Sequence, residues 1–279
     1  MTTVEVRVSP QWLSLREPAD ARSRSRELVR KVMRVRADSP ARMVVHDLGS
    51  GSGSMGRWLA PQLRGSQHWV LHDRDPDLLQ VATAYPPPAA LDGATVTVET
   101  RLGDLTRLRP GDLAGASLVT ASALLDMLTP DELERFVRSC MAAACPALVT
   151  LSVTGRVRLT PSDPLDAVIR DAFNDHQRRT TGGRCLLGPA SASAAVSLYR
   201  AHGARVEVRP SPWRLDSACP SLLLEWLSGW VGAACEERPE LATAAVAYLA
   251  RRHNDLEHGR LAVVVPHLDL LARAPRAGE

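Results

Sequence analysis

The feature that most constrains the fold is an alternation of short apolar segments with helical patterns between residues 41 and 153. The first segment, "ARMVVHDLG", is almost continuously apolar, which is typical of strands buried on both faces of a parallel sheet. Strands that alternate with helices indicate βαβ units and a doubly wound sheet. The expected strands of this region span residues 41–49, 68–73, 94–100, 116–124 and 147–153.

The two ends of the chain are less regular. Residues 18–36 predict one N-terminal helix, with Pro18 in its first turn and an apolar face at helical spacing. After residue 153, the pattern predicts a helix and loop over 161–183, a helix over 191–203, a sixth strand over 204–215, two helices over 219–257 that separate near Pro239, and a seventh strand over 259–272.

The stretch "MVVHDLGSGSGSMGRWLA" carries two overlapping glycine patterns. Residues 51–56 fit G-x-G-x-x-G, which is associated with dinucleotide binding, and residues 47–53 fit the acidic-x-G-x-G-x-G pattern of S-adenosylmethionine (SAM) binding. In both, glycines let the chain turn sharply after a strand and approach a ligand. The loop alone therefore leaves the cofactor open.

Four pieces of sequence, in this order, resemble the class I SAM-dependent methyltransferases. They are "VVHDLGSGSG", "WVLHDRDPDLLQVA", "RLGDLTRL" and "ASLVTASALLDMLTPDEL". The resemblance covers about residues 42–153, and the later strands fit the seven-strand plan more loosely. A nicotinamide enzyme gives no reason to expect the third and fourth pieces at these places.

The resemblance implies a SAM site at the ends of the first four strands. Asp73 matches the carboxylate that accepts hydrogen bonds from both ribose hydroxyls, and Asp104 would accept from the adenine amino group beside the Leu105 N–H. Gly56 is expected to serve helix–strand packing. The residues expected to bind the cofactor are Asp47, Gly49, Ser50, Gly51, Gly53, Asp73, Arg74, Asp104, Leu105, Ala121 and Ser122.

With this resemblance, the expected fold is α/β, with a Rossmann-like, seven-stranded, mostly parallel sheet. A helical N-terminal cap over residues 1–40 precedes a SAM-dependent methyltransferase domain over 41–279. That domain carries helical C-terminal insertions: a lid or acceptor insertion over 155–190 and a helical insertion over 215–258.

The acceptor is less constrained, because methyl transfer from SAM requires orientation more than any particular catalytic side chain. Asp126, after the fourth strand, and His176 are candidates to orient the acceptor or take a proton, and Asn174 and Arg178 are candidates to bind it. The place where amino-directed nucleic-acid enzymes carry Asn/Asp-Pro-Pro-aromatic reads "ASALLDML". We therefore expect a small-molecule acceptor, and a role in specialised metabolism fits this expectation.

Three other functions stay open at this point. The basic segment over residues 16–42 keeps an RNA methyltransferase among the alternatives, although the net charge is only +3 and the chain has two Phe and three Tyr for base stacking. From other classes, the chain could be an NAD(P)-dependent oxidoreductase using "GSGSMG", or a SAM-binding protein without transfer activity.

The remaining expectations concern compartment and metals. No run of about 18 apolar residues and no signal-peptide pattern is found, so we expect a cytoplasmic protein without a membrane partner. The five cysteines form no CxxC pair and no zinc-finger spacing, and no metal site is expected. The sequence makes no prediction about oligomeric state.

Overall fold

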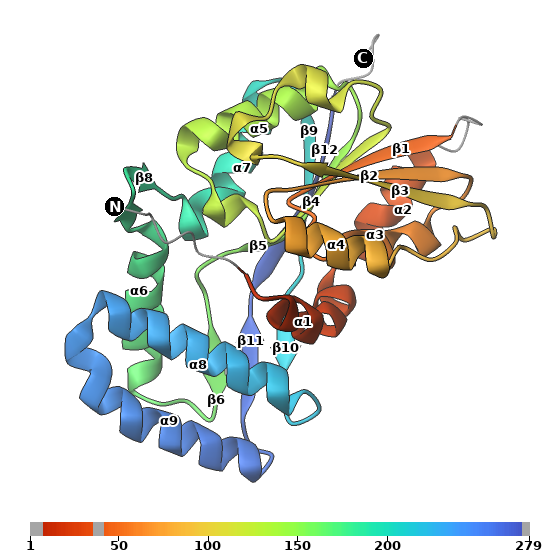
Figure 1. Cartoon of the computed structure of the whole chain (residues 1–279). Coiled ribbons are helices and arrows are strands. Elements are labelled where there is room, and N and C mark those ends of the chain that lie inside the picture. Colours follow the sequence, from red (N-terminus) through yellow and green to blue (C-terminus); the bar gives the residue numbers. More distant parts are fainter. Residues whose placement is uncertain (1–7, 36–41, 275–279) are drawn as a thin grey trace.

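The computed structural model describes residues 8–35 and 42–274 of the chain. Seven strands form one sheet in the order β3-β2-β1-β4-β5-β12-β9, and helices cover both of its faces (Figure 1). The strands of this main sheet are β1 (Met43–Leu48), β2 (Gln67–Asp73), β3 (Val96–Leu102), β4 (Leu118–Ser122), β5 (Ala147–Val153), β9 (Arg205–Pro210) and β12 (His267–Arg273).

One strand of the main sheet runs against the others. Strands β1 to β5 pair in parallel, whereas β12 is antiparallel to both of its neighbours, β5 and β9. The carboxyl ends of β1 to β4 therefore meet at one edge, where ligands bind in open α/β sheets. The expected fold class is confirmed: the sheet is seven-stranded and mostly parallel, with a helical N-terminal cap and helical insertions.

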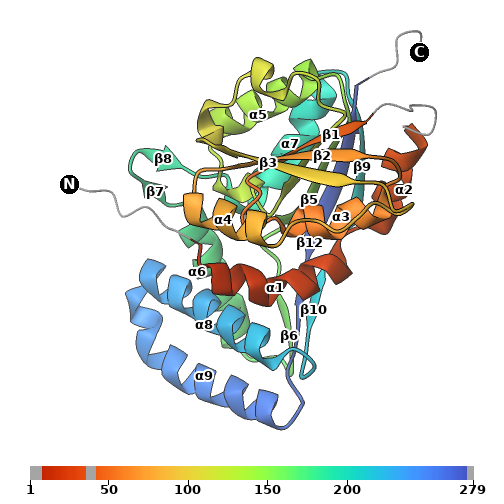
Figure 2. The same ribbon diagram turned by 45° about the vertical axis from the view of Figure 1, so that its right-hand side comes forward.

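Two apolar clusters hold the helices against the main sheet. One contains Trp69, Leu28 and Leu59, and the other contains Phe136 and Tyr199. Figures 1 and 2 show the corresponding helices on opposite faces of the sheet. They are α2 (Arg26–Val35), α3 (Ser54–Leu59) and α4 (Pro76–Ala84) on one face, and α5 (Pro130–Ala142) and α7 (Ser191–Ala201) on the other.

The N-terminal region differs from its prediction, because two helices replace the single helix expected over residues 18–36. Helix α1 (Pro10–Ser23) begins earlier, where the Ser9 side chain accepts from the Trp12 N–H, so Pro18 lies inside the helix. The chain is extended at Arg24, with ψ of 139°, before α2 begins at Arg26. Buried contacts of Arg24 and Ser25 with the main sheet account for the break. Residues 1–7 and 36–40 of the predicted cap lie outside the described part of the chain.

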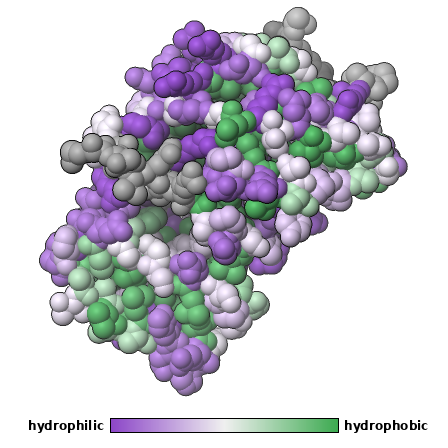
Figure 3. All heavy atoms as spheres, viewed as in Figure 1, coloured by the Kyte–Doolittle hydropathy of each residue, from purple (hydrophilic) through white to green (hydrophobic). Residues whose placement is uncertain are grey.

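A second, three-stranded sheet lies beyond one end of the main sheet. Its order is β10-β11-β6, and with three helices it forms what we call the small-sheet module (Figure 2). Apolar side chains also reach the surface in this part of the molecule (Figure 3). The module consists of β6 (Arg158–Thr160), β10 (Trp213–Leu215), β11 (Ala262–Val265), α6 (Leu165–Arg178), α8 (Pro220–Glu237) and α9 (Ala242–Glu257).

The small-sheet module explains why the predictions of the sixth and seventh strands were wrong in detail. Each predicted strand is divided between the two sheets, the sixth into β9 and β10 and the seventh into β11 and β12. Pro212 and Pro266 lie at the divisions, where proline has no N–H to donate to a continuous ladder. The loop predicted after α6 contains a short hairpin, β7 (Thr180–Thr181) and β8 (Arg184–Cys185).

The lengths and composition of the helices bear on membrane association. Across residues 8–35 and 42–274, no helix combines the length and the apolar character that crossing a bilayer requires.

Candidate functional site

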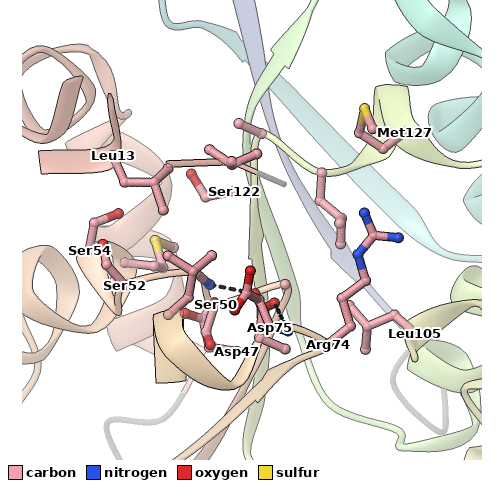
Figure 4. Close-up of a pocket in the computed structure, with 18 of the residues that line it drawn as sticks. Leu13, Asp47, Ser50, Ser52, Ser54, Arg74, Asp75, Leu105, Ser122 and Met127 are labelled. Carbon is pink, nitrogen blue, oxygen red and sulfur yellow. Dashed lines mark hydrogen bonds between the residues drawn. The ribbon is translucent and has the colours of Figure 1, made fainter. Parts of the chain in front are cut away.

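A cavity of about 400 Å³ lies at the carboxyl ends of β1 to β4 and is covered by α1. Figure 4 shows side chains from these elements converging on it. Most of the residues that sequence assigned to the cofactor, and one assigned to the acceptor, come together here. They are Asp47, Gly49, Ser50, Gly51, Asp73, Arg74, Asp104, Leu105, Ser122 and Asp126.

The glycine-rich turn after β1 forms the floor of this cavity. Gly49 has φ of +66°, and a Cβ there would lie 2.8 Å from Leu124 Cδ1. Gly51 has φ of +53° and lies beneath Leu13 of α1. Both positions therefore favour glycine for conformation and for close approach.

The other two glycines of this stretch serve packing. A Cβ on Gly53 would meet Ala82 at 3.1 Å, and Gly53 does not line the cavity. A Cβ on Gly56 would lie 2.9 Å from Pro87 Cγ and 3.4 Å from Trp69. Gly56 thus lets α3 approach the sheet, as the sequence indicated.

Asp73, at the end of β2, ties the glycine turn to the second strand. Its Oδ2 accepts from the Gly51 N–H at 2.7 Å, and its Oδ1 accepts from the Asp75 N–H at 3.0 Å. Each carboxylate oxygen has a second acceptor site. The side chain can therefore hold the loop and still accept two hydroxyl groups from a ligand.

Asp47, at the end of β1, is almost completely buried, with 1% of its surface exposed. Its Oδ1 accepts from the Thr120 hydroxyl at 2.7 Å, and no described group donates to its Oδ2. Burial raises the pKa of Asp47 to about 7, against the opposing effects of the Thr120 hydrogen bond and the Arg24 charge. A buried carboxylate oxygen without a donor suits a cationic or hydrogen-bonding ligand.

The loop after β3 brings Asp104 and Leu105 to the same cavity. Asp104 is exposed, and its Oδ1 accepts from the Thr106 N–H at 2.9 Å, so it caps a short 3₁₀ turn over Leu105–Arg107. The Gly103 N–H donates to the Asp73 carbonyl at 2.9 Å, which fixes this loop beside the second strand.

The segment after β4 forms the far wall of the cavity. Ser122 lines it, whereas Ala121 is fully buried in the core. Ala123 has φ of +49°, an unusual conformation for a residue with a side chain. Beyond it, no described group donates to the buried Oδ1 of Asp126. Burial raises the pKa of Asp126 to about 6, against the effects of its own backbone amide and of the Arg16 charge.

Helix α1, part of the predicted N-terminal cap, contributes a wall of the cavity, although none of its residues was assigned to the site from the sequence. Trp12, Leu13, Arg16 and Asp20 line the cavity. Arg16 Nε lies 3.0 Å from Asp20 Oδ2, and the Arg16 guanidinium lies 4.9 Å from the centre of the Trp213 ring. The Ser9-Pro10 pair, a helix start signal, could have placed α1 correctly.

Arg24, between α1 and α2, belongs to the basic segment over residues 16–42, but it is only 3% exposed. Its Nη2 donates to Ser54 Oγ at 3.2 Å and to Ser122 Oγ at 2.9 Å, and its Nη1 donates to the Ser54 carbonyl at 3.4 Å. Burial lowers the pKa of this guanidinium, while Asp20 and Asp47 act in the opposite direction.

Three residues assigned to the acceptor lie away from the cavity. His176 Nε2 is 3.0 Å from Glu236 Oε2, Asn174 donates to the Gly155 carbonyl, and Arg178 donates to Asp175. None of the three lines the cavity, and we leave them out of the proposed site.

Arg184 of β8 does line the cavity. It donates from Nε and Nη2 to the carboxylate of Glu132 and from Nη2 to the Met127 carbonyl. This bidentate pair fixes the guanidinium at the cavity wall.

As for metals, the residues that the structure describes contain no group of three His, Cys, Asp or Glu side chains arranged to hold an ion.

The fold is that of the class I SAM-dependent methyltransferases, to which the chain's structural neighbours belong. No protein-family model and no curated protein sequence matches the chain. A protein from Anaeromyxobacter dehalogenans, described as a type II methyltransferase, has 19% identity and a TM-score of 0.51, over 90% of this chain and 96% of that one. The cyclopropane synthase MmaA2 from Mycobacterium tuberculosis has 12% identity and a TM-score of 0.49, over 95% of both chains. At these identities the likeness concerns the fold alone.

Proposed function

We propose that the chain is a SAM-dependent methyltransferase that acts on a small-molecule acceptor. The observation that carries this proposal is the single cavity at which the ends of β1, β2, β3 and β4 meet, with Asp73 joining the first two of them. Its volume of about 400 Å³ falls within the range of roughly 300–1,000 Å³ for small-molecule sites.

The residues around the cavity fit SAM group by group. Asp73 has acceptor sites left for the two ribose hydroxyls. Asp104 and the Leu105 N–H, on the third loop, would recognise adenine. Asp47, with one buried oxygen that no described group approaches, suits the ammonium at the amino-acid end. When bound, SAM supplies an electrophilic methyl group on a positively charged sulfonium.

The acceptor would occupy the side of the cavity between the β4 loop and α1. Asp126 lies there, and with a pKa of about 6 it is mostly ionised at neutral pH. A carboxylate of this kind can orient a hydroxyl or amine group and take its proton. Helix α1 lines the cavity, and it would limit the access of water to a bound cofactor and acceptor.

A nicotinamide cofactor is the competing occupant of the glycine loop. The topology of the main sheet favours SAM over it. The dinucleotide fold has a parallel strand order of 3-2-1-4-5-6, whereas β12 here is antiparallel and lies between β5 and β9. Gly56, the last glycine of the dinucleotide pattern, packs on Pro87 and Trp69, a role that either cofactor allows.

Thermal unfolding with SAM, S-adenosylhomocysteine (SAH), NAD and NADP tests the proposal. A ligand at about 100 times its dissociation constant stabilises the fold by about 2.7 kcal/mol, a shift of several degrees for a chain of this size. We expect SAM and SAH alone to raise Tm. A shift with NAD or NADP alone would replace the proposal with an oxidoreductase, and no shift with any of the four would contradict cofactor binding.

A further inference from the structure

The hydroxyl group of Ser122 has both of its acceptor sites filled. It accepts from Arg24 Nη2 at 2.9 Å and from Thr150 Oγ1 at 3.0 Å. Thr150 is fully buried, and Ser122 is the one hydrogen-bond partner of its hydroxyl among the described residues. The Thr150 proton must therefore go to Ser122, because a buried O–H without an acceptor is costly. The proton of Ser122 is left to point into the cavity that this residue lines.

Ser54 contacts the same guanidinium group, that of Arg24. Its hydroxyl oxygen lies 3.2 Å from Arg24 Nη2, the atom that also contacts Ser122. Ser54 lines the cavity as well, and its own proton has no described acceptor. One positively charged nitrogen thus donates to two hydroxyl oxygens at the cavity wall. A hydroxyl group that accepts from a charged donor becomes a stronger donor itself.

Arg24 itself lacks a close counter-charge. It is 3% exposed, and in residues 8–35 and 42–274 no carboxylate forms an ion pair with it. Asp20, Asp47 and Asp269 act on it at longer range. A buried charge without a paired partner is costly, and an anionic ligand just beyond the two serines would offset that cost.

We infer that Ser54 and Ser122 bind a carboxylate, and that Arg24 is the positioning residue that aims their hydroxyl groups at it. Resting on the proposed function, the carboxylate is that of the amino-acid end of SAM. The adjacent Asp47, which also lines the cavity, takes the ammonium of the same amino acid. The turn between α1 and α2, which contains Arg24, therefore recognises the charged end of the cofactor.

The test compares two ligands that differ in this end. SAH carries the amino acid, and 5′-methylthioadenosine lacks it. Affinities of both are measured by calorimetry for the wild type and for Ser122→Ala, Arg24→Gln and Arg24→Lys, with Arg30→Gln as an exposed-arginine control. We expect the preference for SAH to fall at least tenfold in Ser122→Ala and Arg24→Gln. Affinity for 5′-methylthioadenosine should stay within twofold, and Arg24→Lys should recover part of the preference.

Each other result overturns the inference. An unchanged preference in Ser122→Ala means that the serine does not bind the carboxylate. An equal loss of affinity for both ligands means that the turn between α1 and α2 only maintains the structure of the cavity. If Arg24→Gln does not fold, Ser122→Ala still decides, since it removes one hydroxyl and no charge. If the wild type binds neither ligand, the proposed function fails along with the inference. This result differs from an unchanged preference and from an equal loss, because in both of those cases the wild type binds SAH.

Discussion

At the scale of single residues, the glycine turn gives the sharpest test of the cavity. Gly49 and Gly93 both have left-handed backbones, with φ of +66° and +79°. A Cβ on Gly49 would meet Leu124 at 2.8 Å, whereas a Cβ on Gly93 would meet nothing within 4 Å. Alanine at either position should cost about 1–2 kcal/mol of unfolding free energy from backbone strain alone.

We expect Gly49→Ala to lose more unfolding free energy than Gly93→Ala, because Leu124 must also move. It should weaken SAM binding too, since Leu124 and Gly49 both line the cavity. Urea denaturation and calorimetry measure the two effects. Equal losses in the two variants would mean that the contact between the glycine turn and the β4 loop is unimportant.

Asp73 carries the second prediction at this scale. Asp73→Asn should weaken SAM binding by about 10- to 100-fold, because hydrogen bonds to a charged group are worth about 1.5–3 kcal/mol. Asp92→Asn is the control, since Asp92 also accepts a loop N–H, from Gly65, but is exposed and away from the cavity. Unchanged affinity in Asp73→Asn would remove the ribose site from the proposal.

The contrast between Asp73 and Arg24 indicates what sequence can predict at a site. Asp73 lies at the end of an apolar strand, and the carboxyl ends of neighbouring parallel strands meet at one edge of the sheet. A local pattern was therefore enough to predict that Asp73 lies at the cavity. Arg24 is one of several arginines in "ARSRSRELVRK". Its burial depends on Ser54 and Ser122, which lie 30 and 98 residues away along the chain, and no local pattern shows that.

At the scale of secondary structure elements, α1 is the part that should respond to the cofactor. Four of its residues line the cavity, and Leu13 lies over Gly51. We expect SAH to slow amide hydrogen exchange in α1, up to about 100-fold at 100 times the dissociation constant if its opening requires ligand release. Helix α9, which lines no part of the cavity, is the internal control. Unaltered exchange in α1 under saturating SAH would contradict a covering role.

The predicted elements succeeded where their signal was local. β5 was predicted over its observed residues. The capping box of Thr129 and Glu132 that begins α5 is likewise a local signal, formed by residues three positions apart. The small-sheet module was missed because its strands have three or four residues and pair over long separations, such as Leu159 with Val263. A short strand gains its stability from those partners and from the core around Trp213 and Trp230, not from its own pattern.

At the scale of the whole molecule, α1 connects the cavity to the small-sheet module. Trp12 packs edge-on against Trp213 of β10 at 6.3 Å, and Trp213 in turn lies 5.5 Å from the ring of His267. The Trp213 indole N–H donates to Asp20, which also pairs with Arg16. Changes in this core are therefore expected to reach the cavity wall through α1.

Three buried histidines make the stability of the whole molecule depend on pH. Burial lowers the pKa of His46 and of His72, whose rings stack with Nδ1 and Nε2 3.0 Å apart. That bond needs one donor and one acceptor, so it fails when both rings are protonated. Burial also lowers the pKa of His267 to about 3, and the nearby Arg16 charge acts in the same direction.

Because the unfolded chain protonates these rings near pH 6.5 and the folded chain does so only at lower pH, their stabilising effect is complete above pH 6.5 and is lost as the pH falls. Each should cost up to about 1.4 kcal/mol of unfolding free energy per pH unit below 6.5. Asp47 and Asp126, with raised pKa values, act in the opposite direction. Urea denaturation from pH 8 to 4.5 therefore compares His267→Gln with the wild type, so that the carboxyl effects cancel. The variant should show the shallower loss of unfolding free energy as the pH falls, and exposed His253→Gln should match the wild type. Parallel curves for all three proteins would mean that folding does not lower the pKa of His267.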